Sequence, residues 1–219
     1  MRIIRRAIVA VAVSAAVPGA ARAQTPSVIV DQAVAAWSKV SSLSGTFEQT
    51  LTNPLLRAPN VARGEFSQER PTKLAIRFTE PAGDLIVADG TFLWVYLRQT
   101  APNQVIKRPA TDRADVPIDL SQFLDSPATK YDIVANGTEN VGGRPAHGLS
   151  LAPKAGTRSL FSHALVWVDD ADGLIRQFEV VESNGNTRRI RLTKLNVNPP
   201  LTVADFTFTV PKGAKVITP

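Results

Sequence analysis

Large apolar side chains recur at every second position through much of this 219-residue chain, as at Leu74, Ile76 and Phe78. Such alternation is typical of β-strands that bury one face. Asn-Gly and Asp-Gly pairs, such as Asn184-Gly185, separate several of the alternating runs and are typical of tight hairpin turns. The sequence therefore predicts a mainly β fold of about ten or eleven antiparallel strands, arranged as a sandwich or a barrel.

Eleven segments fit this pattern and two others fit a helix. The expected strands are Phe47–Leu51, Val61–Glu69, Leu74–Phe78, Leu85–Asp89, Phe92–Leu97, Tyr131–Ala135, His147–Leu151, Ala164–Val168, Leu174–Glu182, Arg188–Val197 and Phe206–Val210. Pro26–Val40 carries apolar residues at helical spacing, and Pro117–Leu124 begins with a proline and ends before Ser126-Pro127. We expect both of these segments to be helices.

Two of the expected strands, Leu85–Asp89 and Phe92–Leu97, are apolar on both faces. In the second strand, Phe92 and Trp94 point one way and Leu93 and Val95 the other. A half-exposed antiparallel strand needs only one apolar face, so another part of the chain must cover the second. Two interpretations stay open at this point: an ordinary core, or a cavity for a lipid-like ligand.

Residues 1–23 have the pattern of a secretory signal peptide. Three arginines precede the apolar run Ala7–Val17, and Ala21-Arg22-Ala23 fits a cleavage site after Ala23. The run is shorter than the roughly 20 residues that span a bilayer, although a short membrane anchor is the alternative. The chain has no cysteine, so Gln24 stands where a lipid-anchored protein would need one. We expect a mature protein in the periplasm, formed by residues 24–219 as a single domain.

The charge of the mature chain gives no reason to expect nucleic-acid binding. The net charge of +6 falls to +2 without residues 1–23, because four arginines leave and no acidic residue does. We find no catalytic motif, and His147 and His163 are the only histidines, so we expect no enzyme, cofactor or metal site. The acidic turn Asp169–Gly173 is expected to be solvated, with weak calcium binding as the alternative. A monomer is expected, because no symmetric interface is apparent.

An ordered set of motifs resembles the outer-membrane lipoprotein carrier family, the LolA-like periplasmic chaperones. The matching motifs are Phe47-Glu48-Gln49, Gly64-Glu65-Phe66, Glu69-Arg70-Pro71-Thr72-Lys73-Leu74, Asp89-Gly90-Thr91-Phe92-Leu93-Trp94-Val95-Tyr96 and Asp205-Phe206-Thr207-Phe208. Together with weaker matches, they cover nearly the whole mature chain. The resemblance implies an incomplete, unclosed antiparallel β-barrel with a helical lid over an apolar cavity. It also implies a chaperone that binds the acyl chains of lipoproteins and carries them from the inner to the outer membrane.

The same resemblance implies the partners and the site. The partners would be acylated lipoproteins, an inner-membrane lipoprotein-releasing transporter and an outer-membrane receptor. Arg70, directly before Pro71, matches a family arginine that hydrogen-bonds carbonyls of the closed lid; the alternative is a surface pair with Glu69 or Glu80. The candidate acyl-chain cavity residues, each of which could instead be ordinary core, are Trp37, Phe47, Leu51, Phe66, Leu74, Ile76, Phe78, Trp94, Tyr96, Leu120, Phe123 and Leu124.

Two other functions remain open from the sequence. A periplasmic lipid- or lipoprotein-sensing regulatory domain could use the same fold. An uncharacterised hydrolase would need a nucleophile and a base close together, and the sequence offers no such pair.

Overall fold

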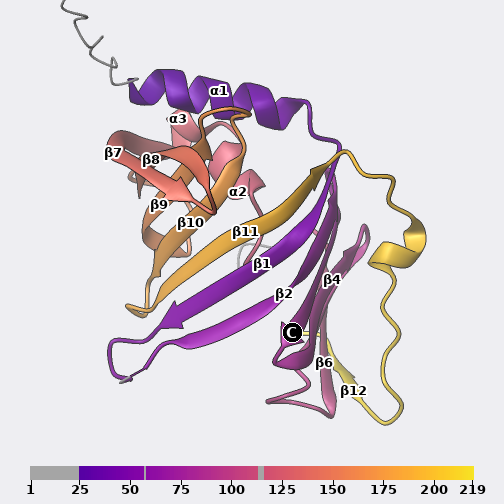
Figure 1. Cartoon of the computed structure of the whole chain (residues 1–219). Helices are drawn as coiled ribbons and strands as arrows, with labels where there is room; N and C mark the ends of the chain where they lie inside the picture. The colour runs from indigo at the N-terminus through magenta and orange to yellow at the C-terminus, as the bar shows by residue number, and fades with distance from the viewer. Residues whose placement is uncertain (1–24, 57, 113–115) are drawn as a thin grey trace, which may run out of the picture.

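The computed structural model of this chain describes residues 25–219 except 57 and 113–115 (Figure 1). The expected signal peptide and its cleavage site lie outside the described residues. The helices are α1 (Pro26–Ser38), α2 (Ser121–Leu124), α3 (Pro127–Lys130) and the 3₁₀ turn η1 (Val203–Phe206). The strands are β1 (Ser42–Thr52), β2 (Asn60–Glu69), β3 (Lys73–Glu80), β4 (Ala82–Asp89), β5 (Phe92–Tyr96), β6 (Gln104–Pro109), β7 (Tyr131–Val141), β8 (Arg144–Pro153), β9 (Phe161–Asp169), β10 (Ile175–Glu182), β11 (Thr187–Val197) and β12 (Lys215–Ile217).

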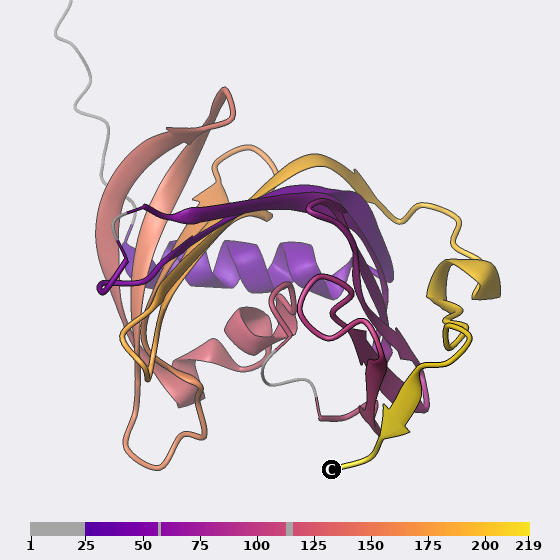
Figure 2. The same ribbon diagram turned by 90° about the horizontal axis from the view of Figure 1, so that it is seen from below.

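All of these strands belong to one sheet in the order β12-β6-β5-β4-β3-β2-β1-β11-β10-β9-β8-β7. Neighbouring strands are antiparallel except β12 and β6, which are parallel. The two end strands, β12 and β7, do not pair with each other, so the sheet curves into an arch and does not close (Figure 2). The fold is therefore the unclosed, mainly antiparallel half-barrel that the sequence resemblance implied.

Helix α1 lies across the concave side of this arch (Figure 2). Pro26 occupies its first turn, where a missing N–H costs nothing, and Ile29, Ala33 and Trp37 repeat every four residues. These three side chains are buried against the sheet. The helix ends where the amides of Lys39 and Val40 donate to the carbonyls of Ala36 and Trp37.

The main core lies between the concave face and the helices. Phe123 of α2 packs close to Phe178 and Phe161, with ring centroids 5.1 and 5.9 Å apart. Leu74 and Ile76 of β3 are fully buried in the same core. Because side chains in a strand alternate between faces, the period-two pattern placed these residues on one side of the sheet.

The expected strand Phe206–Val210 was wrong. Its first residue ends the 3₁₀ turn η1, and the residues after it are not paired in the sheet. The Asp205 carboxylate accepts hydrogen bonds from the Thr202 amide and hydroxyl, which form a capping box and favour a turn. Residues Phe206 and Phe208 still alternate, but they lie against the convex face of the sheet.

The expected helix Pro117–Leu124 is shorter than the sequence indicated. Only Ser121–Leu124 is α-helical, because the Asp119 carboxylate accepts hydrogen bonds from the amide and hydroxyl of Ser121. Such a local turn competes with a helix. The strands β6 and β12 and the helix α3 were not predicted, since all three are short and have little alternation.

Candidate functional site

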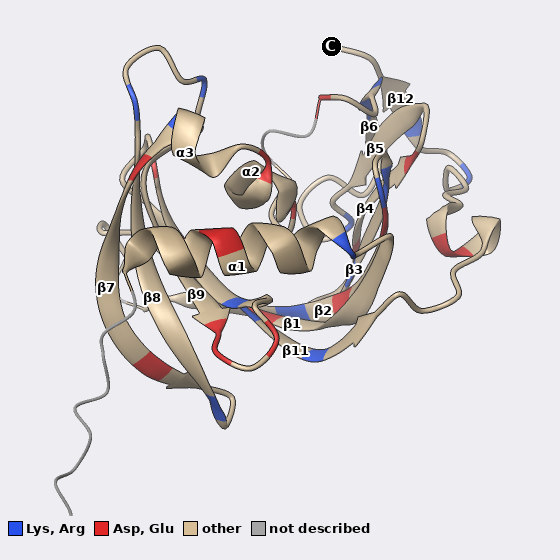
Figure 3. Cartoon of the chain, turned by 90° about the horizontal axis from the view of Figure 1, so that it is seen from above, with Lys and Arg blue, Asp and Glu red and all other residues tan. Residues whose placement is uncertain are grey.

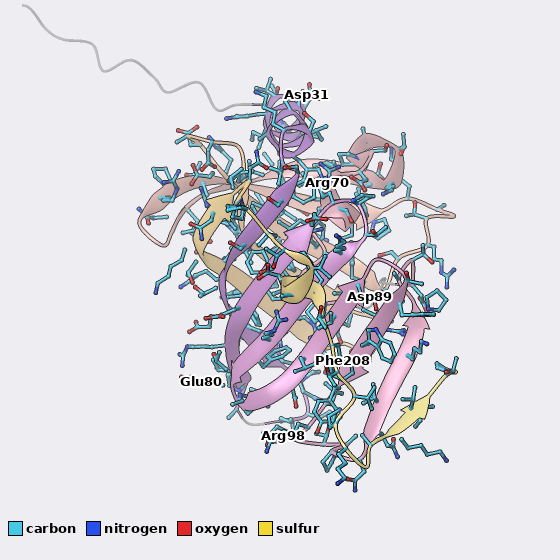
Figure 4. The ribbon with its side chains drawn as sticks, turned by 90° about the vertical axis from the view of Figure 1, so that its right-hand side faces the viewer. Asp31, Arg70, Glu80, Asp89, Arg98 and Phe208 are labelled. Carbon is cyan, nitrogen blue, oxygen red and sulfur yellow. The ribbon has the colours of Figure 1, made fainter. Side chains whose placement is uncertain are left out.

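Arg70, directly after the end of β2, joins the sheet to the end of helix α1 (Figure 4). Its Nη1 donates to the carbonyl oxygens of Trp37 at 2.9 Å and Val40 at 3.1 Å. Its guanidinium carbon lies 4.6 Å from the centroid of a Trp37 ring. The carbonyls at a helix C-terminus lack partners within the helix and attract positive charge, so a guanidinium is well suited to this position.

The two acids considered as surface partners of Arg70 have other partners. Glu69 pairs with Lys73 at 2.7 Å, and Glu80 pairs with Arg63 at 2.6 Å. Arg70 therefore contacts the end of α1 while its acidic neighbours form exposed or half-exposed pairs on the sheet. Both hydrogen-bond acceptors of its Nη1 belong to α1 or to the short segment between α1 and β1.

Within the described part of the chain, two polar atoms on the concave side are buried without a hydrogen-bond partner. They are Trp37 Nε1 and Gln68 Oε1, on side chains of residues that are 3% and 2% exposed. Gln68 pairs in register with Leu43 and Leu74, both of which belong to the main core. A buried polar atom without a partner costs free energy. The contact of α1 with the sheet is therefore closed, but it leaves buried polar atoms without hydrogen bonds to the described residues.

Helices and side chains almost completely fill the space that α1 and α2 cover against β7–β10. The cavity between α1, α2 and strands β7–β10 measures about 20 Å³, close to the size of one water molecule. Val30 and Ala33 of α1 line it together with Phe123 and Leu124 of α2. An acyl chain can enter this space only if the helices move away from the sheet.

The residues expected to line a cavity fall into three groups. The concave core contains Trp37, Phe47, Phe66, Leu74, Ile76, Leu120, Phe123 and Leu124, with Phe78 packed against it. Leu51 is partly buried beyond this core and pairs in register with Arg188. Trp94 and Tyr96 lie on the convex face, where their rings are 5.7 and 6.3 Å from that of Phe208.

Gly64 accounts for the position of Phe47 in the concave core. A Cβ atom at Gly64 would lie 2.7 Å from the Phe47 ring and 2.4 Å from the Arg77 carbonyl oxygen. Glycine thus lets the ring lie flat against β2, and Phe78 packs on it edge to face at 5.4 Å.

A second, open pocket lies beside the concave core and was not predicted. Its volume is about 350 Å³, within the range of small-ligand sites. Its lining residues are Val116, Pro117, Gln122, Leu160, Phe161, Phe178, Val180, Glu182, Ser183, Asn184 and Arg188. The apolar part comes from β9, β10 and the segments that carry Val116, Pro117 and Leu160, and the polar rim includes the ion pair of Arg188 with Glu182 at 2.6 Å. The alternation in β10 indicated which face is apolar, but not that this part would stay uncovered.

The turn between β9 and β10 supports the middle of α1 (Figure 3). Gln32 Nε2 donates to the Asp170 carbonyl at 3.2 Å, and a Cβ atom at Gly173 would lie 3.1 Å from the Ala36 Cβ. The expectation that this acidic turn is solvated was wrong for Asp169, which is 1% exposed. The side chains of Arg144 and Arg176 both reach its carboxylate.

Asp169 stays ionised in spite of its burial. Burial acts to raise the pKa of its carboxyl group, but hydrogen bonds from Arg144, the Ala171 amide and Arg176 outweigh that effect and lower the pKa to about 2. Asp172 completes the group by pairing with the same two arginines. This network fixes the turn on which α1 rests. No local pattern in the sequence indicates that Arg144, 25 residues away, completes it.

A different segment covers the convex face of β3–β5 (Figures 2 and 4). Phe206 is buried against Ala75 and Val87, with Phe208 packed alongside. Arg77 Nη2 donates to the Asp205 carbonyl at 2.8 Å, and β12 then adds to the edge of the sheet at β6. These contacts explain why β4 and β5 are apolar on both faces.

Residues 25–56, 58–112 and 116–219 contain neither a candidate metal site nor a candidate membrane span. No cluster of three or more histidine, aspartate or glutamate side chains there could hold a metal ion. None of the helices in these ranges has the length and hydropathy needed to cross a membrane.

Comparisons with known proteins agree with this architecture. Residues 38–209 match the family described as outer membrane lipoprotein carrier protein LolA. An outer-membrane lipoprotein carrier protein from Cupriavidus taiwanensis is 30% identical over 162 residues, which are 74% of this chain and 73% of that protein. One from Cupriavidus pinatubonensis is 29% identical over 220 residues, covering 99% and 98%.

Among solved structures, an uncharacterized conserved protein from Thermus thermophilus is similar in fold. Its TM-score is 0.56 at 16% identity, and the match covers 88% of this chain and 98% of that one. The shared fold alone does not assign the chain to a family, whereas the sequence matches do. The chain belongs to the outer-membrane lipoprotein carrier family.

Proposed function

We propose that this protein is a periplasmic, non-enzymatic chaperone that holds the acyl chains of lipoproteins against the concave face of its half-barrel. In this proposal it receives the lipoprotein from an inner-membrane transporter and delivers it to an outer-membrane receptor. Helix α1 is the movable cover, Arg70 holds it closed, and the concave core residues that α1 and α2 cover form the acyl-binding surface.

The observation that carries the proposal is the contact of Arg70 with the end of α1. This side chain fastens the main cover of a large apolar surface through two hydrogen bonds to main-chain oxygens and one cation–π contact. Such contacts are broken and remade at modest cost, about 2 kcal/mol in total. The cover can therefore open without unfolding the sheet.

The energetics of lipid transfer explain why such a cover is useful. Burial stabilises an acyl chain by about 0.8 kcal/mol per CH₂ group, so a sixteen-carbon chain resists entry into water by roughly 12 kcal/mol. A carrier must shield the chain, yet it must also release it without an energy source. Closure of α1 over the empty face competes with the acyl chain and so lowers the net affinity.

A release assay tests the proposal. Purified mature protein is added to spheroplasts that synthesise an outer-membrane lipoprotein, and the soluble fraction is examined for a one-to-one complex. The matched control is the same lipoprotein with its acylated cysteine replaced by serine. We expect release of the acylated form only.

Failure of release in the presence of a competent cognate transporter would contradict the carrier proposal. Copurification of free lipid under those conditions would instead favour the lipid-sensing alternative. Equal recovery of the acylated and unacylated forms would also contradict the proposal, because it would show that the protein does not recognise the acyl chains.

A further inference from the structure

The turn between β1 and β2 presents two leucines to solvent. Leu55 is 90% exposed and Leu56 is 64% exposed, and the other leucines of the described residues are more covered. The turn has a defined conformation, because Asn53 accepts hydrogen bonds from both amides: Oδ1 from Leu55 at 2.8 Å and the carbonyl oxygen from Leu56 at 3.0 Å. The backbone therefore holds these side chains outward.

The turn between β1 and β2 has no acidic residue. Residues 53–61 include a single charged residue, Arg57, and Val61 is exposed as well. Residues 183–186, in the turn between β10 and β11, carry no charge. The two turns are neighbours, since a Cβ atom at Gly185 would lie 3.9 Å from Pro54 Cγ. The turn between β9 and β10 beneath α1 differs from both, because it is rich in acidic residues.

This pair of turns is continuous with the open pocket. Ser183 and Asn184 of the β10–β11 turn line that pocket of about 350 Å³. Leu160 also lines it and is itself 48% exposed. A single surface thus joins two protruding leucines, two turns without acidic residues and a largely apolar pocket beside the concave core.

We propose that Leu55 and Leu56 insert into the apolar layer of a phospholipid surface and hold the pocket against it. The purpose of this contact rests on the proposed carrier function, because an acyl chain could then move between membrane and pocket with little exposure to water. The contact itself follows from the surface, because protruding leucines without a neighbouring acidic residue enter a lipid interface. A protein partner recognised by charge would need more ionic groups than these turns offer.

Vesicle flotation tests the proposal. Mature protein is mixed with vesicles of equimolar phosphatidylethanolamine and phosphatidylglycerol, and the partition coefficient is measured for wild type and for the double variant Leu55→Ser, Leu56→Ser. Val203→Ser is the matched control, because Val203 is 74% exposed on η1, far from this turn. We expect the double variant to partition about tenfold more weakly and the control to bind as wild type does.

Three outcomes would overturn the proposal: no vesicle binding by wild type, unchanged binding by the double variant, or an equal loss in the control. If vesicle binding is unchanged but crosslinking to the transporter is lost, the leucines serve a protein partner instead. Binding of an acylated lipopeptide in solution is measured in parallel. Failure of wild type to bind the lipopeptide would contradict the carrier proposal, whereas loss of flotation alone would contradict only the membrane contact.

Discussion

The half-barrel is covered across its concave face and, over β3–β5, on its convex face, and the two covers are fastened differently. On the concave face, α1 is held at its end by Arg70. The buried atoms Trp37 Nε1 and Gln68 Oε1 on this face have no hydrogen-bond partner among the residues that the structure describes. On the convex face, the segment that contains Phe206 has a capped turn, a hydrogen bond from Arg77 and a final strand paired with β6. Both covers bury aromatic side chains, but only the convex cover is also fixed by pairing in the sheet.

In the proposed function, this difference separates a permanent part of the fold from a movable one. The convex cover is paired with the edge of the sheet through its backbone, so we expect it to detach only when the whole protein unfolds. The concave cover depends on side-chain burial and a few hydrogen bonds, so it can open locally at a lower free energy than the whole protein. The following changes test that separation.

The largest effect should come from the convex cover. Replacing the buried ring in Phe206→Ala should lower the free energy of unfolding by about 3–5 kcal/mol, because it leaves a cavity against Ala75 and Val87. Urea denaturation measures the change. Val203→Ala, on the same 3₁₀ turn but exposed, should change stability by less than about 0.5 kcal/mol. A loss below about 1 kcal/mol for Phe206→Ala would show that this cover is not part of the stable core.

The next largest effect on stability is expected in the turn between β9 and β10, which supports α1. Asp169→Asn should lower the free energy of unfolding by about 3 kcal/mol, because Arg176 would remain buried beside a neutral side chain. The lowered pKa of Asp169 also predicts a pH effect. Its contribution of about 2 kcal/mol is fully present above about pH 4 and is lost as the pH falls through about 2.

Stability measured between about pH 2 and 5 checks this effect, with the exposed Asp125→Asn as the control. The Asp169→Asn variant should lack part of the acid-induced loss that wild type shows. An identical pH dependence in the two proteins would mean that Asp169 does not stabilise the turn through its charge.

A smaller effect on stability, but a larger one on transfer, is expected for Arg70→Leu. Loss of its contacts with Trp37 and Val40 should weaken the closed state by about 2 kcal/mol, which raises the open population about 30-fold. The variant should still accept lipoprotein but should pass it to acceptor membranes poorly, because closure no longer competes with the load. Arg63→Leu removes an exposed arginine that pairs with Glu48 and Glu80 and should transfer normally. Normal transfer by Arg70→Leu would contradict its role in closure.

The smallest effect has the opposite sign. Gln68→Met removes a buried acceptor that has no partner among the described residues, and it should stabilise the closed cover by about 1 kcal/mol. Loading with lipopeptide should then become slower, and the change should partly reverse the effect of Arg70→Leu in the double variant. Stopped-flow tryptophan fluorescence measures the loading rate. Faster loading would show that Gln68 makes hydrogen bonds in the closed state.

Alternation and helical spacing were enough to predict most of the concave face. They placed Leu74, Ile76 and Phe78 on one side of β3, and Ile29, Ala33 and Trp37 on one side of α1, because these periods are fixed by backbone geometry. They failed at Phe206 and Phe208, where the same spacing occurs in a turn and an unpaired segment. The spacing of apolar residues indicates which side chains share a face. It does not indicate whether the backbone of that segment pairs with a neighbouring strand.

The candidate site was less predictable because it depends on distant contacts. Arg70 was chosen through a family resemblance, since an arginine beside Glu69 is more often a surface pair, and only the fold brings the carbonyl of Trp37 to it. The burial of Asp169 likewise requires Arg144 from another strand. The side of the sheet that Trp94 and Tyr96 face could not be decided until the position of Phe208 was known.

Thiol labelling tests most directly whether only the concave cover opens. The chain has no cysteine, so single substitutions report one site each. Ala33→Cys lies on the face of α1 that packs on the sheet, at 2% exposure, and Ala75→Cys lies beneath the convex cover, at 0% exposure. Each is labelled with and without Arg70→Leu. We expect Arg70→Leu to accelerate labelling at position 33 about 30-fold and to leave position 75 unchanged. Equal acceleration at both positions, or none at position 33, would contradict the movable cover.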